Sequence, residues 1–502
     1  GGASVQVWDV TNPTQPMVMN GSVQGNAYVF TQDARILREF IAFTTSYYTP
    51  EYAGAVDNQN LHGTGQADYI IVTYPGFREA AERLAEFHRN HSNLRTVIAT
   101  TTQIYNEFSS GSQDISAVRD YVKMFYDRAG TDTTQMPKYL LLFGDASYDY
   151  KDRVTGNTNF VPAFESRASY YLDSASCNDD FFAFLDDNEH IEDYSIPNTL
   201  DVGVGRLPVK TLAEAHNVVN KILHYKSSAS FGPWRLVNTY IGDNEDNAGE
   251  HLEHAEIMTA TVDSLAPIYN DTKVYLDNMP FVSTPGGTRS PESNKAINDQ
   301  VFRGTFMINY SGHGNTKTLA HERILTAEDF NTWKNMDKLP FMVTATCDFA
   351  QFDNPAEVSS GERLVLKKDG GAIAMLTTTQ AVYAGPNRDI NLQFLETQFA
   401  QDARGNWHSF GDAFRIGKNG TYQHTPSWWT IDNFRKFTLL GDPALTPNFP
   451  KYFVHTESIE LMGTGETTDS IGALGGYTIS GKVTDVNGNV LNDFDGYLYV
   501  SF

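Results

Sequence analysis

Residues 305–314, TFMINYSGHG, and residues 341–348, FMVTATCD, share one plan, in which an apolar run is followed by a short polar stretch. A continuous apolar run of this length predicts a β-strand that is covered on both faces, as in a parallel sheet. The first stretch carries His313 just past its strand, and the second carries Cys347. Because the carboxyl ends of parallel strands meet at one edge of a sheet, we expect these two side chains to share that edge.

Similar apolar runs alternate with helical spacing along much of the chain. Further strands are expected at 69–72, 139–143, 236–241 and 372–376. Helices are expected over 77–88 and 115–125, and near 250–264, 291–303, 326–336 and 360–368. This alternation predicts an α/β core, with a mostly parallel sheet flanked by helices.

The pattern changes along the chain and suggests four parts. Residues 1–60 lack helical periodicity and are expected to be the end of an N-terminal β domain and a linker. Residues 61–235 form a first α/β subdomain, which includes an acidic, aromatic insertion at 151–197. Residues 236–450 form the second, catalytic subdomain. Residues 451–502 alternate apolar and polar side chains and are expected to form a small, incomplete β domain.

Composition limits the classes of partner. Lys and Arg total 37 against 61 Asp and Glu, a formal charge of −24. Such an acidic chain argues against nucleic acid and against adsorption to anionic membranes. No apolar run reaches the roughly 20 residues of a membrane helix. No signal peptide opens the sequence, and we expect both ends to be cut points in a longer precursor.

The chain has only two cysteines, Cys177 and Cys347, too few for a disulfide framework. One hypothesis is that Cys177, in a polar stretch, forms a reversible disulfide that masks Cys347. The alternative is an unpaired, partly buried thiol at position 177.

Three of the predicted loops bring together the groups that thiol catalysis needs. Asp243 follows the strand at 236–241, and it joins His313 and Cys347 at the same edge. An imidazole can take the thiol proton, and a carboxylate can hold the ring in the useful tautomer. The N–H groups of Gly314 and Cys347 are candidates for an oxyanion hole. The alternative is a buried apolar cysteine and a turn histidine.

Two segments resemble the His and Cys motifs of the gingipain-type cysteine peptidases. They are NYSGHGNTKTLAHERIL and LPFMVTATCDFAQFDNPAEVSSGERLV, and the resemblance spans about residues 50–450. Within this family the chain is most similar to the sortases of the type IX secretion system. The stretches YLLLFGDASYDYKDR, DVGVGRLPVKTLAEA and FTLLGDPALTP support the same match. The resemblance implies a caspase-like core followed by an immunoglobulin-like domain.

The resemblance also implies roles for single residues. His313 and Cys347 match the catalytic dyad, and Asp243 stands where gingipains have a Glu that supports the histidine. Tyr383 stands at an aromatic wall of the primary specificity pocket. Where the Arg-specific members place an Asp, this chain offers His251 or Glu250, which departs from their pattern.

The implied activity is that of a cell-surface peptidase or transpeptidase. It would cleave the C-terminal sorting domain from secreted cargo proteins and transfer the cargo to an amine acceptor such as anionic lipopolysaccharide. The implied partner is an outer-membrane β-barrel protein (PorV-like), and the implied location is extracellular. Alternatives are a plain gingipain-like endopeptidase and a catalytically silent scaffold that binds sorting domains.

No cofactor is expected to be required for catalysis, and the sequence offers few candidate metal ligands. His251 and His254 do not form an H-E-x-x-H motif, and residues 250–256 are expected to be a solvated helix face. Gingipains bind calcium, and four aspartates are candidate ligands of a structural Ca²⁺, although without EF-hand spacing. They are Asp145, Asp149, Asp179 and Asp180.

Overall fold

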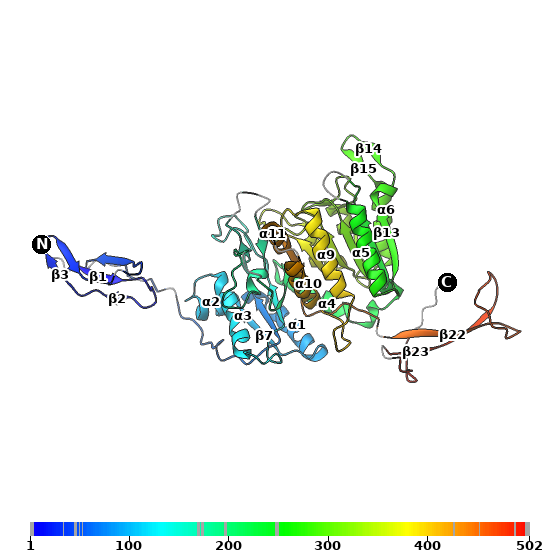
Figure 1. Cartoon of the computed structure of the whole chain (residues 1–502), viewed down its shortest axis with the longest axis horizontal. Helices are drawn as coiled ribbons and strands as arrows, with labels where there is room; N and C mark the ends of the chain where they lie inside the picture. The colour runs from blue at the N-terminus through cyan, green and yellow to red at the C-terminus, as the bar shows by residue number, and fades with distance from the viewer. Residues whose placement is uncertain are drawn as a thin grey trace. The chain divides into compact units, whose positions relative to one another are not determined.

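The computed structural model of the chain is shown in Figure 1. It describes residues 5–33, 35–44, 48–49, 51–52, 54–167, 171, 175–194, 198–245, 250–424, 427–450, 452–485 and 488–496. The chain divides into two compact units, Gly1–Gln59 and Asn60–Phe502. Within the described residues, no helix is long and apolar enough to cross a membrane.

The first unit contains short antiparallel strands. Three of them form a sheet in the order β2-β1-β5, and they are β1 (Gln6–Asp9), β2 (Met17–Val18) and β5 (Phe40–Phe43). Two others, β3 (Gly21–Gln24) and β4 (Ala27–Phe30), pair as a hairpin.

The second unit is built on a ten-stranded sheet. In spatial order its strands are β13 (Asn270–Tyr275), β12 (Val237–Gly242), β16 (Met307–Ser311), β19 (Phe341–Ala345), β20 (Ala374–Thr378), β21 (Phe437–Leu440), β11 (Gly203–Leu207), β8 (Tyr139–Phe143), β6 (Tyr69–Thr73) and β7 (Thr96–Thr100). Neighbouring strands are parallel except for β20 and β21, which are antiparallel. The sheet is therefore mostly parallel, as predicted.

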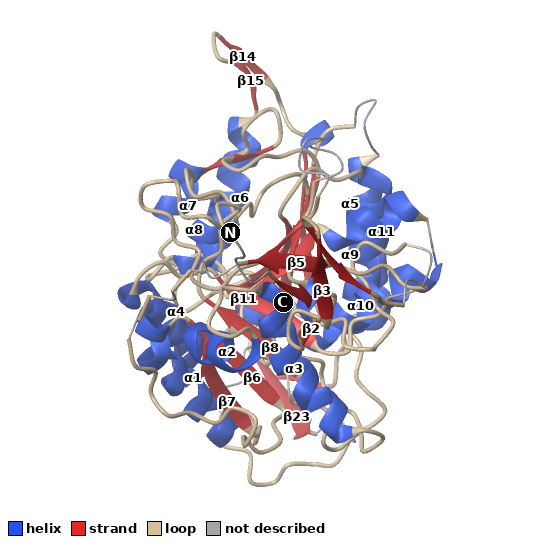
Figure 2. Cartoon of the chain, turned by 90° about the vertical axis from the view of Figure 1, so that its left-hand side faces the viewer, coloured by secondary structure: helices blue, strands red, loops and turns tan. Residues whose placement is uncertain are grey.

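Helices flank this sheet, as Figure 2 shows. They are α1 (Arg78–His91), α2 (Thr101–Phe108), α3 (Ile115–Ala129), α4 (Leu212–Tyr225), α5 (His251–Leu265), α6 (Pro291–Arg303), α7 (Ala327–Thr332), α8 (Ser360–Leu366), α9 (Ala384–Gln398), α10 (Phe410–His424) and α11 (Trp428–Arg435). Ile71 of β6 lies in one apolar cluster, and its neighbours Ile70 and Val72 lie in a second cluster. Both faces of the sheet are thus buried, which explains why its strands read as continuous apolar runs.

Several short elements lie between the sheet and its helices or in the loops. The short strands are β9 (Phe164–Glu165), β10 (Cys177–Asn178), β14 (Val282–Thr284), β15 (Gly287–Arg289), β17 (Thr318–Leu319) and β18 (Leu325–Thr326). The 3₁₀ helices are η1 (Pro75–Phe77), η2 (Asp180–Phe182), η3 (Ser228–Ser230), η4 (Pro233–Leu236) and η5 (Leu276–Asn278). Past residue 450, β22 (Phe453–Leu461) and β23 (Tyr477–Thr484) form an antiparallel ribbon. The immunoglobulin-like domain expected there stays a prediction.

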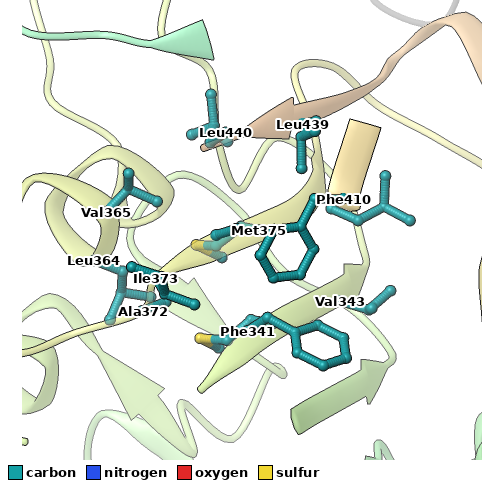
Figure 3. Close-up of a cluster of buried hydrophobic side chains, with 14 of the residues drawn as sticks. Phe341, Val343, Leu364, Val365, Ala372, Ile373, Met375, Phe410, Leu439 and Leu440 are labelled. Atoms are coloured by element: carbon teal, nitrogen blue, oxygen red, sulfur yellow. The ribbon is translucent and has the colours of Figure 1, made fainter. Parts of the chain in front are cut away.

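The apolar cluster beneath β19 and β20 fixes the strands that carry the site. Figure 3 shows ten labelled side chains from β19, β20, β21, α8 and α10 and from the turn before β20. They are Phe341, Val343, Leu364, Val365, Ala372, Ile373, Met375, Phe410, Leu439 and Leu440. Helix α8 begins at a capping box, in which Ser359 and Glu362 exchange hydrogen bonds. The position of β19 is therefore set by packing on several elements at once.

A buried ion pair lies on β11, next to the junction with β21. Arg206 is fully buried and holds Asp179 through two hydrogen bonds of 2.7 and 2.8 Å. Its remaining N–H groups donate to the backbone carbonyls of Gly144, Val161 and Pro162. All five guanidinium N–H groups are thus engaged, which the desolvation of this charge requires.

Replacing Arg206 by Met should destabilise the protein strongly. The change leaves Asp179 buried without its partner, and breaking such a pair costs about 3–5 kcal/mol. Denaturant unfolding followed by circular dichroism measures the difference. The control is Lys295→Ala, which removes an exposed ion pair with Asp299 and should cost less than about 1 kcal/mol. Equal effects of the two changes would contradict the role given to Arg206.

Candidate active site

His313 and Cys347 follow neighbouring parallel strands at the same level. Ser311 at the end of β16 pairs with Ala345 at the end of β19. His313 comes two residues after Ser311, and Cys347 comes two residues after Ala345. The parallel register therefore places the two loops side by side at the carboxyl edge of the sheet, as the sequence predicted.

Two glycines allow the loops to pack closely. A Cβ on Gly312 would lie 2.4 Å from Cβ of Asp243 and 2.5 Å from the hydroxyl of Tyr310. A Cβ on Gly314 would lie 2.5 Å from Oγ1 of Thr346, the residue before Cys347. Any side chain at either position would separate these loops, so glycine is required for close approach.

Asp243 holds the histidine loop through its backbone. It follows β12 directly and is 1% exposed. Its Oδ2 accepts a hydrogen bond of 2.9 Å from the backbone N–H of His313, and its Oδ1 accepts one of 3.0 Å from Asn244. Burial raises the pKa of Asp243, and these two N–H groups act in the opposite direction. The predicted support of the imidazole ring by Asp243 stays a prediction.

The ring of His313 lies among other histidines. It stacks on His321 with centroids 4.6 Å apart, and His251 meets it edge-on at 5.1 Å. His251 and His254 are 4% and 7% exposed, so the prediction of a solvated face over 250–256 was wrong for these two residues. They face inward because α5 packs against the sheet and α9, which the neighbouring charges concealed in the sequence. Glu250, before the helix, is exposed, so His251 is the one that reaches the site.

The thiol of Cys347 is half-buried and close to one backbone unit. Its Sγ lies 3.5 Å from both the N and the O of Val382. Burial raises the pKa of the Cys347 thiol, and the carboxylate of Asp348 adds to the effect. The Val382 N–H and the Lys436 ammonium act the other way. In this arrangement the thiol is held in its neutral form at neutral pH.

An exposed aromatic pair lies next to Val382, the residue that contacts the thiol. Tyr383 follows Val382 directly, is 50% exposed, and donates its backbone N–H to Asn433 at 2.7 Å. Trp429 meets its ring edge-on at 6.3 Å and is 44% exposed. Tyr383 was predicted as a pocket wall, whereas Trp429 was not predicted; its signal in the sequence is the pair Trp428 and Trp429 just after the helix cap at Ser427.

The four aspartates proposed for calcium are engaged separately. Asp179 pairs with Arg206 and Asp180 with Lys418. Asp149 accepts hydrogen bonds from the backbone of residues 153 and 154, and Asp145 lies near Lys210. The structure does not gather these four carboxylates into one group, and structural calcium stays a prediction.

Both cysteines are free thiols in the structure, so the hypothesised disulfide is not formed. Cys177 lies in β10 and is fully buried, whereas the sequence placed it in a polar stretch. Its pairing with β9 gives it this protected position.

This arrangement is that of a cysteine peptidase with a caspase-like core, and the comparisons agree. Residues 62–448 match peptidase family C25, to which the chain belongs. No curated protein sequence matches it significantly. The fold is similar to the Arg-specific cysteine proteinase gingipain R (RgpB), with a TM-score of 0.59, 15% identity, and coverage of 86% of this chain and 94% of that one.

A second similar structure is dimeric latent PorU from Porphyromonas gingivalis. Its TM-score is 0.57 at 22% identity, and the match covers 97% of this chain but 40% of that one. The RgpB pro- and mature-domain complex of the same organism gives a TM-score of 0.59 at 16% identity, covering 84% and 93% of the two chains.

Replacing Gly314 by Ala should lower kcat by about 10²-fold or more, because the new methyl group would push the two loops apart and displace the N–H of Gly314, a predicted oxyanion donor. Peptidase assays measure the change. The control is Gly65→Ala, since a Cβ there meets nothing within 4 Å. An active Gly314→Ala variant would show that the loop spacing is not critical.

Alkylation of Cys347 by iodoacetamide should be slow at neutral pH and rise steeply above about pH 8.5, because only the thiolate reacts. The burial-raised pKa moves this rise to higher pH than for an ordinary thiol. Mass spectrometry after timed quenching measures the rate at Cys347, and Cys347→Ser reports the background from the buried Cys177. A rate that is already maximal at about pH 6 would contradict a neutral resting thiol.

Proposed function

We propose that this chain is a cell-surface cysteine peptidase and transpeptidase that removes the C-terminal sorting domain from secreted cargo proteins. The observation that carries the proposal is the placement of His313 and Cys347 beyond paired positions of adjacent parallel strands. Membership of peptidase family C25 supports it, as does the similarity to PorU, a type IX secretion sortase.

The reaction follows from the two side chains. The imidazole of His313 takes the Cys347 proton, and the thiolate attacks the peptide carbonyl at the sorting-domain junction. The N–H groups of Gly314 and Cys347 stabilise the oxyanion. The C–N bond then breaks, His313 returns the proton to the leaving amine, and the cargo remains as a thioester on Cys347.

The thioester has two fates. An amine acceptor attacks it and gives a new amide, with release of the Cys347 thiol, or water attacks it and gives a carboxylate. We propose the amine route, with anionic lipopolysaccharide as the acceptor. A PorV-like outer-membrane β-barrel would hold the enzyme at the extracellular surface. Tyr383 and Trp429 offer an exposed aromatic surface beside the thiol for a substrate side chain.

One observation favours a second candidate, a catalytically silent scaffold that binds sorting domains. The pKa of the Cys347 thiol is raised, whereas an active nucleophile needs access to its thiolate. A resting peptidase whose substrate rearranges the Val382 contact would look the same before substrate binds. The two candidates differ once cargo is present.

Incubation with a cargo protein that carries its sorting domain tests the proposal. Release of that domain should be lost in Cys347→Ser and fall by about 10³-fold or more in His313→Ala, since the two side chains of the proposed dyad act as a unit. Intact-mass spectrometry should detect a thioester that hydroxylamine cleaves.

A simple amine such as glycine amide separates the two fates of the thioester. A cargo–amide product supports transpeptidation, and a carboxylate product alone indicates a plain gingipain-like endopeptidase. Binding of cargo without cleavage, unchanged in Cys347→Ser, would establish the scaffold and refute the proposal.

A further inference from the structure

Three acidic groups from separate segments meet in a buried space outside the catalytic dyad. Glu165 lies on β9, Cys177 on β10 and Asp353 in the loop that follows Cys347. One oxygen of each carboxyl group and the Sγ of Cys177 all lie within 4.8 Å of one another. Cys177 is fully buried and Asp353 is 2% exposed.

Part of this group lacks any hydrogen-bond partner. Among the described residues, Oε1 of Glu165 and Oδ1 of Asp353 are buried and accept no hydrogen bond. Buried carboxylate oxygens are normally satisfied, so each of these calls for an explanation. Both carboxyl groups contribute an oxygen to one group with the thiol, and a cation bound there would offer them a partner.

The nearest positive charge cannot do so. All five N–H groups of Arg206 are occupied by Asp179 and by backbone carbonyls. Arg206 is therefore committed to other acceptors, and the three acidic groups repel one another unless they are protonated or share a metal ion.

We propose that Glu165, Cys177 and Asp353 bind a divalent transition-metal ion of the zinc type. A thiolate favours zinc over calcium or magnesium, which prefer oxygen ligands alone. In a tetrahedral zinc site the ligand atoms lie about 3.5 Å apart, which small side-chain adjustments can reach from the present spacing. Water fills the fourth position. Binding displaces the thiol proton and any carboxyl protons to solvent.

The position of the site gives it a structural role. The carbonyl oxygen of Cys177 accepts a hydrogen bond of 2.6 Å from Thr379, in the loop after β20. The carbonyl oxygen of Asp353 accepts one of 2.9 Å from the backbone N–H of Tyr148. A metal ion would thus join the β9–β10 hairpin to the loop that carries the nucleophile. The ion would hold the loop after Cys347 in position and would have no contact with the substrate.

Cobalt is the probe that tests this site, because a thiolate-bound Co²⁺ has a near-ultraviolet charge-transfer band and a tetrahedral ion has strong visible bands. The whole chain is stripped with a chelator under a phosphine reductant and titrated with Co²⁺. We expect both sets of bands to saturate at about one ion per chain and to disappear when Zn²⁺ is added.

Variants assign the bands to the site. Cys177→Ser should abolish the charge-transfer band, and Cys347→Ser should keep it, which matters because these are the only two cysteines. Glu165→Gln and Asp353→Asn should keep the band but weaken Co²⁺ binding by about tenfold or more, since even indirect changes at metal sites cost that much. Asp348→Asn, in the same loop but outside the group, is the matched control and should bind normally.

This test is independent of the proposed function. The Cys347→Ser variant cannot act as a cysteine peptidase, yet it should still bind Co²⁺ at the proposed site. Circular dichroism of each variant shows that it is folded. No charge-transfer band in the folded wild type would overturn the proposal and leave three protonated acids. A band lost in Cys347→Ser and kept in Cys177→Ser would place the metal at the nucleophile and equally refute it.

Discussion

The parallel pairing of β12, β16 and β19 constrains the whole site. These strands run side by side with matched ends, so Asp243, His313 and Cys347 all emerge at one edge. The glycines of the histidine loop then let the three loops touch. Each strand is buried on both faces, so none can slide without exposing apolar side chains. The chemistry therefore depends on register, which packing beneath the strands maintains.

Electrostatics around the site follow from the same burial. Asp243 is buried in a low-dielectric environment, which raises the pKa of its carboxyl group. The same environment strengthens its hydrogen bond to the backbone N–H of His313. Burial raises the pKa of the Cys347 thiol for the same reason. Arg206 and Asp179 are also buried, but they form an ion pair, and their mutual hydrogen bonds compensate for the cost of removing both charges from water.

Much of the fold could be predicted because the central strands are continuous apolar runs. Strands such as 139–143 and helices such as 291–303 match the structure closely. Four strands of the sheet were missed, among them β13, whose first four residues are all polar, and β11, which contains two glycines and an arginine. The inward-facing His251 was also misjudged, since charged neighbours hide which face of α5 packs. The grouping of Glu165, Cys177 and Asp353 could not be predicted, because only the fold brings together residues so far apart in sequence.

The place of β21 has a consequence for how the molecule is assembled. This strand comes late in the sequence yet lies in the middle of the sheet, between β20 and β11. Until residues 437–440 are in place, β20 and β11 are open edges that can pair with other chains. A chain emerging from a ribosome thus completes its sheet near the end of its synthesis. Pairing of β21 with β20 and β11 brings together residues far apart in sequence, and such pairing forms slowly. Until it forms, the incomplete sheet needs protection from aggregation.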